Sequence, residues 1–165
     1  MTQRQLEDVV WTATVMALGL DPTSEETQSA VRISWPLTEE NSPNWLRTEN
    51  VVFIRVEPYS DDYSTLWETS HADSNDGFKE AVANHEAYET LWLCYGPDSL
   101  EQAQKLRYGL GRESIRAYLN AQSVAFWPHL QMPTHVPEQD RSGAWWERYD
   151  VRAPMYVKGM RQYSE

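Results

Sequence analysis

Four histidines and a single cysteine are the residues of this chain best suited to metal binding or nucleophilic catalysis. His129 and His135 are near each other in the sequence, but their spacing across prolines matches no zinc-binding template. His71 and His85 stand apart from them. Cys94 lies within an apolar run, which is typical of a small buried hydrophobe rather than a nucleophile. The sequence therefore predicts no metal site and no catalytic thiol.

Acidic residues are the other candidates for chemistry. Catalysis by two carboxylates requires acids on facing elements across a cleft, whereas adjacent acids in polar loops are usually only solvated. Asp61-Asp62, together with Asp73 and Asp76, could bind calcium, but the spacing is not that of an EF-hand loop. A nucleophile elbow, a P-loop and a dinucleotide-binding fingerprint are all absent from the sequence. We predict no catalytic residues and no cofactor.

The composition limits the partners of the chain. Asp and Glu outnumber Lys and Arg by 25 to 14, so the formal net charge is −11. A protein that grips phosphates needs a basic patch, so we expect no tight binding of nucleic acid, although DNA could slide past an acidic surface. Eight Trp and nine Tyr accompany only three Phe. Trp and Tyr combine apolar area with a polar tip, which suits both interfaces and half-buried cores.

The length of 165 residues predicts a single domain spanning 1–165. One cysteine excludes an intrachain disulfide. The first eight residues are polar and acidic, unlike a signal peptide, and no apolar run approaches the ~20 residues that span a bilayer. We expect no membrane contact and folding in a cytoplasm.

Two aromatic strands are the strongest pattern in the sequence. The segments 89–96 and 143–151 each carry large apolar side chains on both faces, so helices, a second sheet or another subunit must cover both faces. Trp145 and Trp146 should point to opposite faces, one into the core and one towards a partner. The alternative is a strand covered on both sides within one chain. The predicted subunit interface comprises Trp145, Trp146, Glu147, Arg148 and Tyr149, with Glu147 and Arg148 supplying charge specificity.

The remaining pattern predicts how these strands are held. Apolar residues recur at helical spacing from Leu6 to Leu20, and Gly19 and Pro22 mark the end of that helix. Segments 30–35 and 50–57 read as strands, the second bounded by Pro58 and paired antiparallel with 89–96.

After the 89–96 strand, the pattern changes to helix. Asp98 and Glu101 form a pair typical of a capping box, and Gly109 and Gly111 favour either a kink or a break into two helices. A short strand at 124–127 follows. The last strand continues from 145–151 towards Val157, with Pro154 at an edge or bulge.

An acidic segment separates the two central strands. From Glu57 to Glu89 there are nine acidic residues and one basic residue, Lys79. A stretch this long in a compact domain is usually functional or disordered, and its position between strands favours a long loop or hairpin arm over about 58–87. The acidic residues singled out on this arm are Asp61, Asp62, Glu68, Asp73 and Asp76. Helices and antiparallel strands are segregated along the chain, which predicts an α+β fold with helices on one face of an antiparallel sheet.

Three segments together resemble the neck or tail-terminator proteins of tailed bacteriophages. They are the strand ending at Gly96 with the helix opening at Asp98-Ser99-Leu100, the early strand 50–56, and the late strand 143–150. The resemblance covers nearly the whole chain. It implies a structural virion protein without catalytic residues, assembled in the host cytoplasm. The stretch from Pro154 to the end departs from the purely strand-like end expected of the family.

The resemblance further implies a homo-oligomeric ring, typically hexameric, that caps the tail tube and joins it to the head connector. Its partners would be other copies of the chain, the tail tube protein and the head-completion protein, with the sheath as a further candidate, while DNA passes without specific binding. The acidic arm would line the bore or reach a partner ring. Two other interpretations are a carbohydrate-binding module with Trp and Tyr platforms, and a small hydrolase with loop carboxylates.

Overall fold

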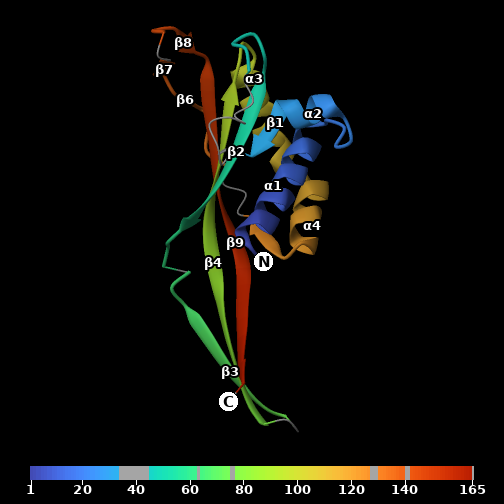
Figure 1. The fold of residues 1–165 in the computed structure, drawn as a ribbon, viewed down its shortest axis with the longest axis vertical. Coiled ribbons are helices and arrows are strands. Elements are labelled where there is room, and N and C mark those ends of the chain that lie inside the picture. The colour runs from blue at the N-terminus through green and yellow to red at the C-terminus, as the bar shows by residue number, and fades with distance from the viewer. Residues whose placement is uncertain (34–44, 63, 75–76, 127–129, 140–141, 165) are drawn as a thin grey trace.

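A computed structural model of the chain describes residues 1–33, 45–62, 64–74, 77–126, 130–139 and 142–164 (Figure 1). Side chains are described at these positions except 72–74, 77–79 and 160–164. The predicted strands 30–35 and 124–127 appear as β1 and β5, and their ends at Trp35 and Trp127 lie outside the described residues.

The main sheet contains seven strands within the described part of the chain, built around the long strand β4. One side of β4 pairs along its length with β9, and the other side pairs first with β3 and then with β2. All pairings are antiparallel except that of β1 with β2. The strands are β1 (Val31–Ile33), β2 (Val51–Tyr59), β3 (Trp67–Ser74), β4 (Gly77–Tyr95), β5 (Val124–Phe126), β6 (Thr134–His135) and β9 (Arg148–Ser164).

Helices cover one face of this sheet, so the predicted α+β fold class is confirmed (Figure 1). The helices are α1 (Gln3–Leu18), α2 (Glu25–Ala30), α3 (Ser99–Leu110) and α4 (Glu113–Ala121). Thr2 caps the start of α1, and its side chain and that of Gln5 form a reciprocal capping box. The helix ends at Gly19, which takes the left-handed conformation with φ 69° that glycine adopts without a Cβ clash.

The core lies between the helices and the sheet, and Trp92 of β4 is at its centre. Ile54 of β2 and Val151 of β9 are its partners in register, and all three side chains are fully or almost fully buried. The indole N–H of Trp92 donates to Oγ1 of Thr14 on α1 at 2.8 Å, so the polar tip of the ring is satisfied inside the core. The predicted pairing of 50–57 with 89–96 is therefore confirmed, and it builds the core.

The predicted break between the two later helices is also confirmed, but glycine has a second role there. Helix α3 ends at Leu110 and α4 starts at Glu113. A Cβ on Gly109 would lie 2.5 Å from the carbonyl oxygen of Ala17, so this glycine lets α3 approach the backbone of α1. The predicted capping box was wrong: Asp98 makes no side-chain cap, and its carboxylate accepts instead from Nδ2 of Asn50 at 2.8 Å.

Two strand boundaries differ from the prediction. Strand β2 runs through Pro58 to Tyr59 instead of ending before the proline. The late aromatic strand divides at Glu147, whose carbonyl accepts from the backbone N–H of Gly96 at 3.2 Å. Before that point, Trp145-Trp146 (β8) pairs with Glu138–Gln139 (β7) in a separate two-stranded sheet.

After the division, β9 continues much further than the sequence suggested. It passes Pro154 and ends at Ser164. Strand β6 pairs with β9 up to Asp150 and β5 pairs with it from Met155, so Pro154 falls between them. On that side no described strand faces the proline, which is consistent with the predicted edge position.

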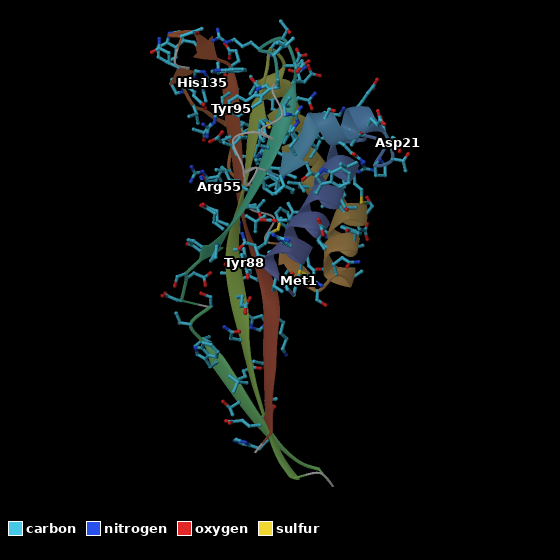
Figure 2. The ribbon with its side chains drawn as sticks, in the orientation of Figure 1. Met1, Asp21, Arg55, Tyr88, Tyr95 and His135 are labelled. Atoms are coloured by element: carbon cyan, nitrogen blue, oxygen red, sulfur yellow. The ribbon has the colours of Figure 1, made fainter. Side chains whose placement is uncertain are left out.

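Strands β3, β4 and β9 extend beyond the helices as a narrow ribbon (Figure 1). We call this ribbon, comprising β3, residues 77–86 of β4 and residues 158–164 of β9, the arm, and the rest of the chain the body. Tyr88 lies near the point where the arm begins, while Tyr95 and His135 lie at the opposite end of the sheet (Figure 2). The acidic segment is thus a β-hairpin that stands away from the body.

Candidate functional site

The residues that could do chemistry are dispersed. Among the described residues, no group of three or more His, Cys, Asp and Glu side chains could hold a metal ion. His71 is on β3, His85 is on β4, and His135 packs against Tyr149 with ring centroids 5.1 Å apart. His129 lies outside the described residues. No described helix has the length and apolar character needed to cross a membrane.

Cys94 is buried in the core, as the sequence predicted. Burial, with a further contribution from the negative charge of Asp150, raises the pKa of its thiol to about 12. The thiolate is the nucleophilic form, so a thiol with this pKa is unreactive near neutral pH.

An aromatic cluster covers the other face of the sheet, at the end of the body far from the arm. Phe53 of β2 and Tyr95 of β4 alternate with the core residues and therefore point away from the helices. Trp45 packs on both rings, with centroid distances of 4.8 and 5.7 Å. Trp146 joins them at 5.5 Å from Trp45 and 5.9 Å from Tyr95. The chain thus covers both faces of this end of its sheet by itself.

The two consecutive tryptophans consequently differ in role. Trp146 is half-buried in the aromatic cluster, and the guanidinium of Arg47 lies 5.2 Å from its ring centroid. Trp145 is 64% exposed. Of this pair, the inward residue is Trp146, and the side chain free to meet a partner is Trp145.

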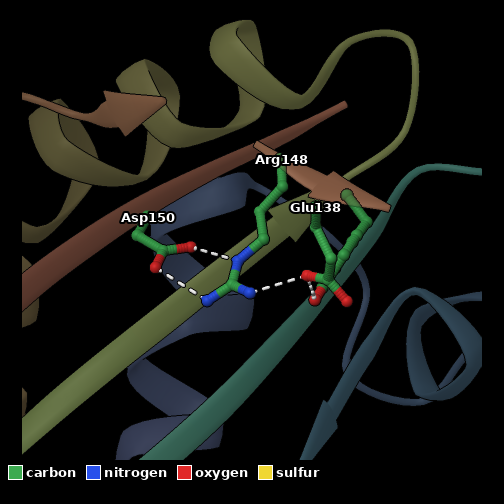
Figure 3. Close-up of polar contacts among 4 residues, drawn as sticks. Glu138, Arg148 and Asp150 are labelled. Atoms are coloured by element: carbon green, nitrogen blue, oxygen red, sulfur yellow. Dashed lines mark hydrogen bonds and ion pairs between the residues drawn. The ribbon is translucent and has the colours of Figure 1, made fainter. Parts of the chain in front are cut away.

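A charged network (Figure 3) meets the aromatic cluster at Tyr95, whose hydroxyl contacts Glu138. Arg148 donates two hydrogen bonds to Asp150, at 2.8 and 2.9 Å, and a third to Glu138 at 2.7 Å. The hydroxyl of Tyr95 donates to the same oxygen of Glu138 at 2.7 Å. Asp150 is only 3% exposed, so its charge depends on the bidentate pair with Arg148.

Protonation in this network follows from its contacts. Burial lowers the pKa of the Arg148 guanidinium, but the hydrogen bonds to Asp150 and Glu138 outweigh it, and the pKa lies above its ordinary value. Burial, and then the hydrogen bond to Glu138, raise the pKa of the Tyr95 phenol well above its usual range. Arg148 therefore stays charged and Tyr95 stays neutral, which keeps the network intact over the physiological pH range.

The structure thus separates the five residues of the predicted interface. Trp145 and Glu147 are exposed, whereas Trp146, Arg148 and Tyr149 are half-buried within the chain. Arg148 forms ion pairs with Asp150 and Glu138, so its charge is largely neutralised inside the chain. The sequence did not single out Trp45 or Glu138, because each meets its partners only through tertiary contacts.

The acidic residues of the segment are also unequal. Asp61 accepts from the hydroxyl of Tyr156 at 2.6 Å and from the backbone N–H of Ser64 at 2.7 Å, so it anchors the turn that enters the arm. Asp62 and Glu68 are exposed. Asp73 is in β3, and Asp76 lies outside the described residues.

Comparison with known protein families shows to which family the chain belongs. A family model described as phage neck terminator protein matches residues 4–158. The chain belongs to the phage neck terminator family. Among curated proteins none matches the sequence. The family is structural, so this neck terminator is a structural component of the virion that associates with other head and tail proteins.

Proposed function

We propose that the chain forms a closed homo-oligomeric ring, typically of six copies, which caps the tail tube, joins it to the head connector and lets DNA pass. The observation that carries this proposal is the family match over residues 4–158, which assigns the chain to neck terminators. The proposed partners are further copies of the chain, the tail tube protein and a head-completion protein, with the sheath as a further candidate.

The distribution of covered and uncovered surface supports a ring. Helices cover one face of the sheet in the body, and the aromatic cluster covers the other face at the end far from the arm. Among the described residues no such layer covers the arm, and the exposed Trp145 belongs to β8, which lies at the opposite end of the molecule (Figure 1). A ring needs different surfaces on each copy that meet in a head-to-tail manner, and uncovered regions are available for contacts with other copies or with neighbouring rings.

Charge supports the passage of DNA. A net charge of −11 disfavours a stable grip on phosphates, so a bore made from this chain would let DNA move. We propose that the arm, through residues such as Glu68, and the turn that enters it, through Asp62, line that bore or reach the next ring. Asp61 is less suited to this role, because its carboxylate is held by Tyr156.

The test is electron microscopy of particles made without this chain. Loss of the chain should leave tails that are not joined to heads, or tails of uncontrolled length. Tails of normal length that are fully joined to heads would refute the terminator role. Complementation by the unaltered chain is the control that assigns the defect to this gene product.

A further inference from the structure

The arm presents two strand edges with no partner among the described residues. Strand β3 pairs with β4 alone, and beyond residue 157 strand β9 also pairs with β4 alone. These edges lie on opposite sides of the ribbon. A strand rises about 3.3 Å per residue, so the eight residues of β3 give an open edge of about 26 Å. Open edges of this length are templates for pairing with another chain unless something covers them.

The described part of the arm also lacks a second layer that would stabilise it alone. The side chains from Trp67 to His71 are exposed, and those from Glu80 to Glu86 are half-buried. Trp67 is 67% exposed, although it stands on the helix-side face of the ribbon, opposite Asn84. A narrow ribbon with uncovered faces is marginal in water, which indicates that the arm is completed by something outside the chain.

The two edges carry opposite charge. Strand β3 includes Glu68 and Asp73 and no Lys or Arg. The free part of β9, residues 158–164, includes Lys158 and Arg161 and no acidic residue. Like charges oppose pairing of β3 with β3 or of β9 with β9, while opposite charges favour β3 with β9. A contact between two different edges is heterologous, and repetition by rotation closes it into a ring.

We propose that the outer edge of β3 in one copy adds to the free edge of β9, residues 158–164, in the next copy, so that the arms form one continuous sheet around the ring. The inference rests on the proposed ring and specifies its interface. Both β3 and β9 run antiparallel to β4, so they run in the same direction. Rotation about an axis along the arm preserves that direction, and the pairing between copies is therefore parallel.

When copies are related by rotation about an axis along the arm, equivalent residues stay level. The register of β3 and β9 through β4 within one chain therefore identifies the positions that should meet between copies. Through β4, Ser70 stands level with Gln162, and Glu68 stands level with position 160, two residues from Lys158 on the same face. Diagonal neighbours across paired strands remain within reach of long side chains. Glu68 of one copy and Lys158 of the next are thus placed to form an ion pair across the new strand pair.

Cross-linking in assembled phage particles tests the pairing. One variant carries S70C and another carries Q162C, and the two are supplied together to phage lacking the gene, followed by a short bis-maleimide. Cys94 gives little background because it is buried. We expect cross-linked dimers in mixed particles and none in particles with either variant alone. Dimers from S70C alone, or cross-links only to a chain of different mass such as a tube protein, would overturn the proposal.

Charge reversal provides a second measurement. E68K or K158E alone should lower the yield of cross-linked dimers by about two- to fivefold, and the double reversal should restore it. The matched control is E101K with K105E on the exposed surface of α3, which should leave the yield unchanged. Particles that have a neck ring but give no S70C–Q162C dimer would reject this interface, while the proposed ring would still stand. Joined particles from which the chain is absent would reject the ring itself.

Discussion

The body and the arm are built from the same strands but are stabilised in different ways. In the body, β4 places Trp92 against the helices, and the opposite face of the strand is covered by the aromatic cluster. In the arm, the same strand has β3 and β9 beside it and no described layer on either face (Figure 1). The body therefore holds its own core, whereas our proposal makes the arm depend on contacts with other chains. Substitutions should therefore affect folding in the body and assembly in the arm.

The largest effect is expected from Trp92→Ala. The change opens a cavity in the centre of the core and removes the hydrogen bond to Thr14. The free energy of unfolding should fall by about 3–5 kcal/mol, measured by urea denaturation. A loss below about 1 kcal/mol would contradict the assignment of Trp92 to the centre of the body.

A comparable loss is expected from Arg148→Met. Without the guanidinium, the buried carboxylate of Asp150 has lost its ion pair, which should cost about 3 kcal/mol of unfolding free energy. The matched control is Arg152→Met on the same strand. Arg152 lies 3.8 Å from Glu89 in an exposed pair, so its loss should cost less than about 1 kcal/mol. Equal losses from the two variants would show that burial does not distinguish these arginines.

A smaller loss is expected from Gly109→Ala. The added methyl group would press against the backbone of Ala17, and overpacking of this kind costs about 1–3 kcal/mol. In the same urea experiment, Gly111→Ala is the control. Its nearest neighbour is 3.4 Å away and its backbone is helical, so it should be neutral or stabilise by up to about 1 kcal/mol. A larger loss of unfolding free energy from Gly111→Ala than from Gly109→Ala would show that helix propensity, and not the contact of α1 with α3, determines the effect of alanine at these positions.

The smallest effect on folding is expected from Trp67→Ala in the arm. Its side chain is largely exposed, so the free energy of unfolding should change by less than about 0.5 kcal/mol. The yield of joined phage particles should nevertheless fall if the arm contacts the next copy as proposed. If Trp67→Ala lowered the free energy of unfolding nearly as much as Trp92→Ala, the arm and the body would not differ in how they are stabilised.

Much of the body followed from the sequence. Helical spacing located α1, a β-branched run located β2, an aromatic run with apolar side chains on both faces located residues 89–95 of β4, and Gly109 and Gly111 marked the break between α3 and α4. These signals are local, since each depends on which residues recur within one segment. The capping box at Asp98 was predicted wrongly because Asn50, far away in the sequence, binds its carboxylate.

The sequence by itself determined the α+β class, the antiparallel pairing of β2 with β4, the buried state of Cys94 and the family resemblance. Only the tertiary structure decided that Trp146 turns inward while Trp145 stays exposed, and that the acidic segment is a strand pair of the arm. The physical reason is that exposed strands need no apolar alternation, so their pattern is weak. The direction of a side chain in a short strand depends on which distant residues, here Trp45 and Tyr95, lie against it.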